Sequence, residues 1–231
     1  MSRTRRQLTE AEDELHVVVV GASGRTGRLV IEQASEAGHR VTAVVRSPDR
    51  EPLPADVHLM QADVVADSAF ELPTDADVVI SALGKRSNRD RAPVCERGTT
   101  NVIASMRRNG IRRLIVVSAS PVLRSGAGEP AWFRLTVRPC VRLAGRHIYA
   151  DLEAMETLLR ESGNGIDWTV VRPGYLVDRM GGSYDLRLEM NAMGVVHRAD
   201  LAHALLAIAE RPGAAGRAFG LASRAAASVA A

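Results

Sequence analysis

Short apolar runs alternate with longer amphipathic stretches along this 231-residue chain. Six of the runs are rich in valine and isoleucine and have the length of a strand. They are residues 15–20, 40–45, 57–62, 76–81, 112–118 and 167–172. Continuous apolar runs of this kind are typical of parallel strands that are covered on both faces. The pattern therefore predicts a buried parallel sheet.

Helical periodicity fills most of the intervals between these predicted strands. The helical stretches are residues 25–37, 64–71, 93–109, 148–162 and 198–211, and we expect a last short strand at 216–223. Gly38, Gly110 and Gly163 directly follow three of the helices, where a left-handed cap favours glycine. Repeated strand–helix–strand units wind right-handed. We therefore predict an α/β fold, a doubly wound parallel sheet with helices on both faces.

A single domain is expected over residues 15–222, because this length suits one α/β domain with a sizeable core. Residues 1–14 are polar and charged and residues 223–231 are rich in alanine, so both are expected to be loose tails. Two irregular stretches, 121–147 and 176–197, follow the carboxyl ends of predicted strands, where open α/β sheets build their ligand crevice. They predict a small substrate-covering region; alternatively, they only cover the edge of the sheet.

Composition and charge narrow the expected partners. The net charge of +3 comes from dispersed arginines, and aromatic residues, at 3%, are too few for a base-stacking platform. Cys95 and Cys140 form no CxxC motif, which argues against structural zinc and fits a reducing cytoplasm. No apolar run reaches the ~18 residues of a membrane span. We expect a cytoplasmic monomer or small homo-oligomer that binds a small molecule, without metal, nucleic acid or membrane.

The sequence VVVVGASGRTGRLV, residues 17–30, places three glycines between a predicted strand and a predicted helix. In this context Gly21 permits a tight turn, Gly24 lets the backbone approach a pyrophosphate, and Gly27 lets the helix pack closely on the strand. The amino end of the helix offers N–H groups and partial positive charge to phosphates. Further donors are expected from the side chains of Ser23, Arg25 and Thr26. The stretch predicts a dinucleotide site.

The second predicted strand indicates which dinucleotide binds. It ends in VVRSPDR, with Arg46 at its tip and no acidic residue there; Asp49 follows three residues later. An acidic residue at this tip would bind the ribose 2′-hydroxyl of NAD, whereas an arginine accommodates a 2′-phosphate. The residues therefore favour NADP(H). Asp63, after the third predicted strand, is expected either to hold the adenine amino group or to cap the helix predicted at 64–71.

Several of these stretches together resemble a known family. GASGRTG, the VVR strand end, QADV, SALG, RESGNGIDWTVVRPGYLVD and HRADLAHALL are similar to the atypical short-chain dehydrogenases/reductases, and within them to the NAD(P)H-binding, NmrA-like group that includes flavin reductase. The resemblance spans about residues 15–222. It implies a Rossmann fold and NADPH as cofactor. It also extends the cofactor-binding positions to four residues of QADV and SALG: Val64, Ala82, Leu83 and Gly84.

The catalytic residues are less clearly marked. Many short-chain enzymes use a Tyr-x-x-x-Lys pair for proton transfer, but no tyrosine of this chain is followed by lysine at that spacing. Ser118 and Ser120 end the fifth predicted strand, and by resemblance Ser120 falls beside the nicotinamide. Tyr175 falls where flavin reductase has a histidine. The remaining expected site positions follow the sixth strand on the nicotinamide side: Arg172, Pro173 and Gly174.

These features favour an NADPH-dependent reductase that transfers hydride to a flat conjugated acceptor, such as a flavin or quinone. That chemistry needs orientation of two stacked rings and little acid–base catalysis by the protein. Two alternatives stay open, because one fold hosts many chemistries. One is an NADP-sensing regulatory protein of NmrA type. The other is a reductase, dehydratase or epimerase of a specialised biosynthetic pathway.

Overall fold

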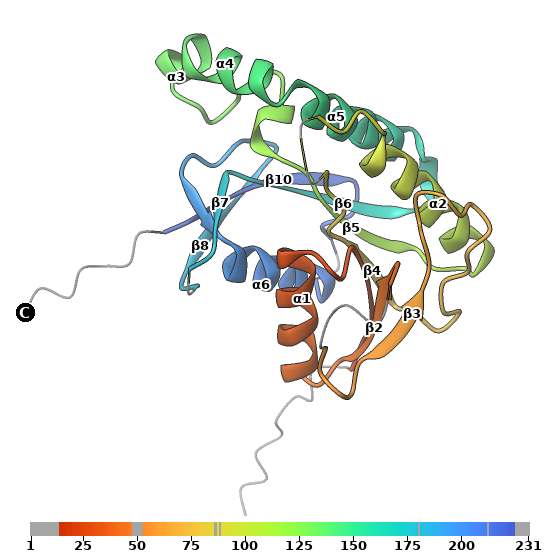
Figure 1. Cartoon of the computed structure of the whole chain (residues 1–231). Coiled ribbons are helices and arrows are strands. Elements are labelled where there is room, and N and C mark those ends of the chain that lie inside the picture. The colour runs from red at the N-terminus through yellow and green to blue at the C-terminus, as the bar shows by residue number, and fades with distance from the viewer. Residues whose placement is uncertain are drawn as a thin grey trace, which may run out of the picture.

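The protein is described here from a computed structural model. The structure describes residues 14–47, 53–85, 87, 89–179, 181–211 and 213–224. Two layers of helices enclose a central sheet (Figure 1). The expected loose tails, 1–14 and 223–231, lie largely outside the described residues, as does Asp49.

The central sheet is mostly parallel. Its strands, in the spatial order β3-β2-β1-β4-β5-β6-β10-β8, are β3 (His58–Gln61), β2 (Arg40–Val45), β1 (His16–Val20), β4 (Val78–Ser81), β5 (Arg113–Val117), β6 (Asp167–Pro173), β10 (Arg217–Ser223) and β8 (Tyr184–Leu188). Only β8, at one edge, runs antiparallel to its neighbour among the strands of this sheet in the described chain. Two short strands, β7 (Tyr175–Val177) and β9 (Val195–His197), pair separately. The predicted Rossmann-type doubly wound sheet is confirmed.

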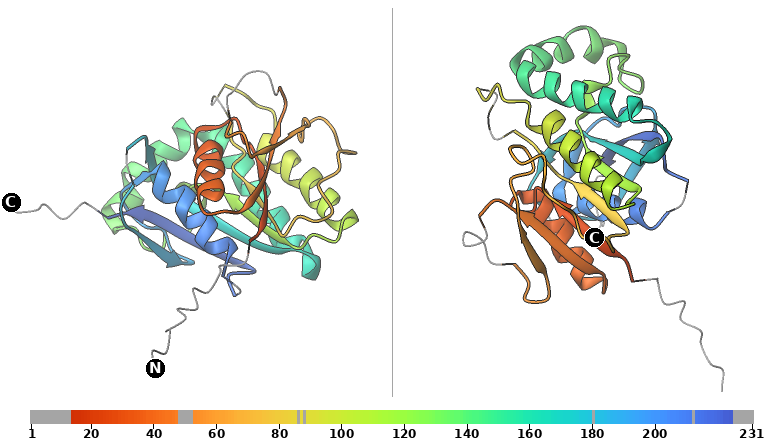
Figure 2. Two further views of the ribbon diagram at one scale, coloured as in Figure 1. Left: turned by 90° about the horizontal axis from the view of Figure 1, so that it is seen from below. Right: turned by 90° about the vertical axis from the view of Figure 1, so that its right-hand side faces the viewer.

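The helices lie on both faces of the sheet (Figures 1 and 2). They are α1 (Arg25–Glu36), α2 (Val94–Arg108), α3 (Ala131–Leu135), α4 (Val137–Ala144), α5 (Arg146–Glu161) and α6 (Arg198–Ala209), with short 3-10 turns η2 (Ser120–Val122) and η3 (Gly163–Gly165). Helices α1 and α6 pack together on one face, whereas α2 and α5 pack together on the other.

The valine run of β1 shows why continuous apolar strands form here. Val18 and Val20 belong to the apolar cluster under α2 and α5, whereas Val17 and Val19 belong to the cluster under α1 and α6. Successive side chains of a strand point to opposite faces, so a strand covered on both sides must be apolar at every position. The sequence pattern is therefore a direct consequence of the two helical layers.

One predicted helix, residues 64–71, does not form. The carboxylate of Asp63 accepts hydrogen bonds from the backbone N–H groups of Val65 and Ala66, at 3.1 and 3.2 Å, and Asp67 bonds locally to Ala69. Aspartate side chains that bond to nearby backbone compete with helix formation. The segment is a series of turns, and the interpretation of Asp63 as a helix cap was wrong.

The expected irregular segments contain more regular structure than predicted. The stretch 121–147 begins in η2, includes α3 and α4, and ends in the first turn of α5. The stretch 176–197 contains β8, which extends the main sheet, and most of the small β7–β9 pair. These strands are short, and β8 lies at an edge, so they lack the continuous apolar pattern of the buried strands. Gly38, Gly110 and Gly163 adopt the predicted left-handed backbone, with φ of 83°, 72° and 70°.

Candidate cofactor and substrate site

The glycine turn connects β1 to α1 at the carboxyl edge of the sheet. Gly21 has a φ of 81°, and a Cβ there would lie 2.8 Å from the carbonyl oxygen of Ala82 in the loop after β4. A Cβ on Gly27 would collide with the carbonyl oxygen of Gly21. Gly24 precedes α1 without any side-chain cap. The N–H groups of the first turn are therefore available to a bound anion.

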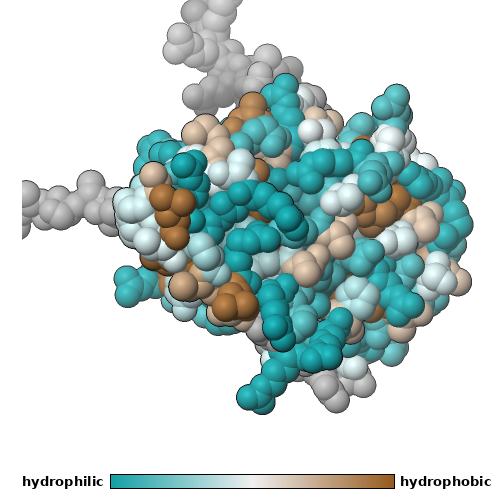
Figure 3. All heavy atoms as spheres, turned by 90° about the horizontal axis from the view of Figure 1, so that it is seen from above, coloured by the Kyte–Doolittle hydropathy of each residue, from teal (hydrophilic) through white to brown (hydrophobic). Residues whose placement is uncertain are grey.

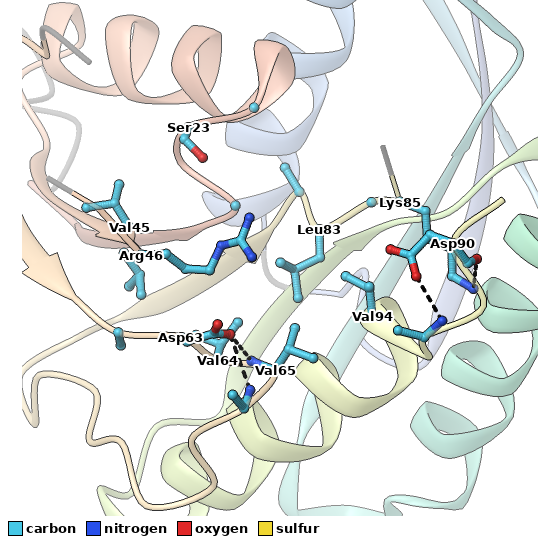
Figure 4. Close-up of a pocket in the computed structure, with 18 residues that line it drawn as sticks. Ser23, Val45, Arg46, Asp63, Val64, Val65, Leu83, Lys85, Asp90 and Val94 are labelled. Carbon is cyan, nitrogen blue, oxygen red and sulfur yellow. Dashed lines mark hydrogen bonds between the residues drawn. The ribbon is translucent and has the colours of Figure 1, made fainter. Parts of the chain in front are cut away.

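A cavity of about 560 Å³ opens beside this turn (Figure 4). Its walls come from the carboxyl ends of four neighbouring parallel strands and from the start of α2. The lining residues are Gly21, Ser23, Gly24, Val44, Val45, Arg46, Ala62, Asp63, Val64, Val65, Ala66, Ala82, Leu83, Gly84, Lys85, Asp90, Ala92 and Val94. This is the edge at which doubly wound sheets bind ligands.

Nine of the residues expected to bind cofactor line this cavity: Gly21, Ser23, Gly24, Arg46, Asp63, Val64, Ala82, Leu83 and Gly84. The side chain of Arg46 extends across the cavity toward Ser23 and Leu83 (Figure 4). The turn around Asp63 is held by Asn101, whose buried side chain donates to the carbonyl of Val64 at 2.9 Å. Helix α2 thereby fixes the wall of the cavity.

Arg25, in the first turn of α1, contacts a different part of the chain. Its guanidinium donates to the carboxylate of Asp178 at 2.5 Å, and Arg198 donates to the other oxygen of that carboxylate. Burial opposes ionisation of Asp178, but these two hydrogen bonds hold its pKa below the ordinary value. The start of α1, directly after the glycine turn, is thus tied to the segment after β7. Thr26 and Gly27 continue α1 beside it.

A buried ion pair at the opposite wall was missed by sequence reasoning. The Nζ of Lys85 lies 3.6 Å from a carboxylate oxygen of Asp151 and donates to the carbonyl of His147 at 2.9 Å. Asp151 also accepts hydrogen bonds from the backbone N–H groups of Cys95 and Glu96, each at 3.0 Å. A side chain of α5 thereby caps the amino end of α2. Burial, reinforced by Asp151, raises the pKa of the Cys95 thiol, which therefore stays protonated.

The side chain of Ser118 points into the layer between the sheet and α5. Its hydroxyl donates a hydrogen bond to Glu156 at 2.7 Å. The Glu156 carboxylate also accepts hydrogen bonds from Arg172 at 2.9 Å and from Arg160 at 2.8 Å. Burial favours the neutral form of Glu156, but the hydrogen bond from Arg172 and the other donors hold its pKa below the ordinary value. Arg172 is 1% exposed and braces β6 against α5. It does not line the cavity beside the glycine turn, called the cofactor cavity below.

Ser120 and Asn191 join the two segments that were expected to form the substrate pocket. The Ser120 hydroxyl donates to the carbonyls of Arg172 and Pro173, at 3.3 and 3.1 Å. The fully buried side chain of Asn191 donates to the carbonyl of Ser120 at 2.8 Å and to Glu129 at 2.7 Å. The stretches 121–147 and 176–197 therefore form one connected structure.

Tyr175 begins β7, directly after Gly174, and its side chain is 76% exposed. Its backbone N–H donates to the carbonyl of Gly194 at 3.3 Å, so only the backbone is fixed by this pairing. The structure therefore places Ser118 and Ser120 in buried hydrogen bonds and Tyr175 at the surface. Nine of the expected cofactor-binding residues lie together in the lining of the cavity, whereas these three lie outside it.

Comparison with known proteins identifies the family. The sequence model of an NAD(P)H-binding family matches residues 21–212. The chain belongs to this NAD(P)H-binding family. An uncharacterised chloroplastic protein of Arabidopsis thaliana is 31% identical over 173 residues, covering 69% of this chain and 59% of that protein. A Schizosaccharomyces pombe protein is 31% identical over 179 residues, covering 71% of this chain and 72% of its own length.

Solved structures share the fold of this NAD(P)H-binding protein. An oxidoreductase of Lactococcus lactis superposes with a TM-score of 0.73 at 18% identity, covering 91% of each chain. A proposed NADH-flavin reductase of Streptococcus pneumoniae has a TM-score of 0.69 at 21% identity, covering 91% of this chain and all of that one. At these identities the likeness establishes the Rossmann fold. The family match indicates a nicotinamide cofactor.

The glycine turn fits such a cofactor, because it leaves backbone close to the cavity and the amino end of α1 uncapped. Within the part of the chain that the structure describes, no group of three or more histidine, cysteine, aspartate or glutamate side chains is placed to hold a metal ion. No described helix combines the length and hydropathy needed to cross a bilayer.

Proposed function

We propose that the protein is an NADPH-dependent oxidoreductase that transfers hydride to a flat conjugated acceptor, such as a flavin or quinone. The observation that carries the proposal is the cavity at the carboxyl edge of β3, β2, β1 and β4, with the glycine turn on one side and Arg46 at the tip of β2. The names of the Lactococcus and Streptococcus structural neighbours support the same class of reaction.

The preference for NADPH rests on Arg46. A planar guanidinium can stack on adenine and pair with a 2′-phosphate. Arg46 and Ser47 are the described residues that follow β2, and neither is acidic. An acidic side chain at this tip would favour the free 2′-hydroxyl of NADH instead.

The proposed type of acceptor is inferred from the roles of the serine side chains that follow β5. The reduced nicotinamide supplies a hydride when it is bound, and a flavin or quinone completes its reduction with a proton from water. Ser118 donates to Glu156, and Ser120 donates to the carbonyls of Arg172 and Pro173 at the end of β6, so these hydroxyls position the walls of the site. The chain lacks a Tyr-x-x-x-Lys pair. An acceptor that needs orientation more than acid–base catalysis therefore fits this site best.

Steady-state assays test the proposal directly. Purified protein is mixed with NADPH and, in turn, with FMN, riboflavin and several quinones, and the loss of NADPH absorbance is followed. We expect turnover of at least one acceptor, faster with NADPH than with NADH. Tight NADPH binding without turnover of any acceptor would overturn the reductase proposal. It would favour an NADP sensor, a function consistent with the bonded hydroxyls of Ser118 and Ser120.

Ser120 and Tyr175 are the side chains that we propose to influence acceptor orientation: Ser120 through the backbone of Arg172 and Pro173, to which it donates, and Tyr175 through its exposed side chain. We expect Ser120→Ala and Tyr175→Phe to lower kcat/KM for the acceptor while leaving NADPH affinity nearly unchanged, because both lie outside the cofactor cavity. Tyr184 is half-buried on β8, with its hydroxyl hydrogen-bonded to Nδ1 of His203 at 2.8 Å, and Tyr184→Phe is a control for loss of a tyrosine hydroxyl outside the cofactor cavity. Unchanged acceptor kinetics in both site variants would remove these residues from the mechanism.

A further inference from the structure

Helices α3 and α4 expose large apolar side chains to solvent. Leu135 is 76% exposed, Leu143 is 71% exposed and Trp132 is 63% exposed. Exposed leucines elsewhere, such as Leu59 and Leu188, keep more than half of their surface covered, at 43% and 46% exposure. Contiguous exposed apolar groups on a protein surface mark interaction sites more often than isolated ones do.

Helix α4 turns charged side chains toward the protein and apolar side chains toward solvent, which is the reverse of an ordinary surface helix. Its arginines turn inward: Arg138 is 7% exposed and donates to the carbonyl of Arg124 at 3.0 Å, and Arg142 donates to Glu153 and to the carbonyl of Pro121. The outward positions are Pro139, Cys140 and Leu143. A surface helix normally turns its charged face to water. The outer face of α4 is therefore suited to an apolar environment.

Arginines surround this apolar face. Arg134 is exposed in the last turn of α3, and Arg146 is exposed at the start of α5, directly after α4. Arg124 is also 79% exposed, but its guanidinium pairs with Glu153 at 2.7 Å. No aspartate or glutamate occurs between residues 130 and 150. The nearest carboxylates, Glu129 and Glu153, are largely buried against the inward-facing arginines. The rim of the face is therefore positively charged.

We propose that this surface, Trp132, Leu135, Val137, Leu143 and the flanking Arg134 and Arg146, docks onto an anionic lipid membrane; we call it the α3–α4 face. Apolar side chains that insert at the headgroup boundary, flanked by arginines, are the pattern of interfacial helices. A second copy of the chain fits less well. A two-fold interface would set the arginine rim against an identical rim, and like charges would repel.

The position of the face is compatible with this role. Helices α3 and α4 project from one end of the molecule, while β2 and β3, which border the cofactor cavity, lie at the other end (Figures 1 and 2). Figure 3 views the side that carries α3, α4 and α5, where brown apolar residues interrupt the hydrophilic surface. Docking would leave the cofactor cavity open to solvent, and it requires no helix that crosses the bilayer.

Vesicle co-sedimentation of the full chain tests this surface. Vesicles of phosphatidylcholine mixed with phosphatidylglycerol are compared with vesicles of phosphatidylcholine alone. We expect the protein to sediment with the anionic vesicles only. The double variant Leu135→Ser/Leu143→Ser should lower the partition coefficient about tenfold or more, because both side chains are almost fully available to lipid. Arg134→Gln should lower it about fivefold.

The matched control is Leu59→Ser/Leu188→Ser, which removes two exposed leucines from β3 and β8 and should leave sedimentation unchanged. Circular dichroism, measured on every variant, shows that each one is folded and keeps this test independent of the reductase proposal. Absence of sedimentation with anionic vesicles, or equal sedimentation of wild type and the Leu135/Leu143 variant, would refute the proposal. So would a wild-type dimer that the same variant dissociates, since the face would then bind a second copy.

Discussion

The guanidinium of Arg46 extends from the end of β2 into the cofactor cavity, where it faces Ser23 and Leu83 (Figure 4). At the scale of a residue, the proposed preference for NADPH over NADH, two cofactors that differ by a single phosphate, depends on this one side chain. A charge-assisted hydrogen bond contributes roughly 1.5–3 kcal/mol. A single substitution at Arg46 can therefore test the proposed preference.

We expect Arg46→Ala to weaken NADPH binding about 10- to 100-fold and NADH binding much less, because the charge-assisted contact to the 2′-phosphate is lost. Fluorescence titration of the two reduced cofactors measures both affinities. Arg40→Ala is the matched control: Arg40 begins the same strand at the opposite edge of the sheet, where it pairs with Asp75. Equal weakening of both cofactors would contradict the assignment of Arg46.

Glu156 illustrates a residue whose role is structural. Because its pKa lies below the ordinary value of 4.5, its ionised form stabilises the fold above about pH 4.5, and this contribution is lost as the pH falls through the lower, folded-state pKa. Glu156→Gln should therefore lower the free energy of unfolding by about 3–5 kcal/mol at neutral pH, because Arg172 is left buried without its charged partner.

The difference between wild type and Glu156→Gln should shrink as the pH is lowered, since the wild-type carboxylate then becomes protonated as well. Urea unfolding at neutral and acidic pH measures it. Glu161→Gln, at the exposed end of the same helix, should change the free energy of unfolding by no more than about 0.5 kcal/mol. A stability difference that is independent of pH would contradict the ionised pair.

At the scale of elements, two buried asparagines hold two different parts of the site. Asn101 of α2 supports the turn at Val64, on the wall of the cofactor cavity. Asn191 joins η2, through the carbonyl of Ser120, to the loop before β9 and also contacts Glu129. Each therefore links segments that are far apart in sequence, and each does so through side-chain hydrogen bonds in a buried setting.

The two asparagines should consequently give opposite kinetic effects. We expect Asn101→Ala to weaken NADPH binding and Asn191→Ala to raise KM for the acceptor with NADPH affinity retained. Each substitution leaves a buried group without its partner and should lower the free energy of unfolding by about 1–3 kcal/mol. Initial-rate kinetics and cofactor titration on both variants provide the comparison. The same kinetic effect from both would show that the two walls are not separate.

At the scale of the whole molecule, the residues that line the cofactor cavity lie between positions 21 and 94. They come from the ends of four strands and from the start of α2. A ligand that binds only the folded state stabilises all of these elements together. At 100 times its Kd, NADPH should add about 2.7 kcal/mol to the free energy of unfolding. For a domain of this size, that corresponds to a rise in Tm of about 5–10 °C.

Thermal melts with NADPH, NADH and no cofactor, at equal concentrations, measure this effect. The rise should be larger with NADPH than with NADH. AMP, which lacks both the nicotinamide and the 2′-phosphate, serves as a control and should give a smaller rise. A Tm that does not move with either dinucleotide would contradict the assignment of the cavity.

The amino-acid sequence by itself determined seven of the eight strands of the main sheet, most of the described helices and the glycine turn. These features depend on local patterns: apolar runs for strands covered on both faces, amphipathic periods for helices, and glycines where a Cβ would collide with Ala82 or with the turn itself. The sequence also indicated nine of the residues that line the cavity, Arg46 among them, since the carboxyl ends of parallel strands meet at one edge.

Only the tertiary structure decided which polar side chains meet. Lys85 with Asp151, Glu156 with Arg172, and Asn191 with Ser120 are pairs from segments that are distant in sequence. Their one sequence signal was the acidic residues on the otherwise apolar face of α5, at Asp151 and Glu156. The outward apolar face of α4 likewise became visible only when Glu129 and Glu153 were seen to draw its arginines inward. Long-range charge pairing is a property of the assembled fold, and no local pattern encodes it.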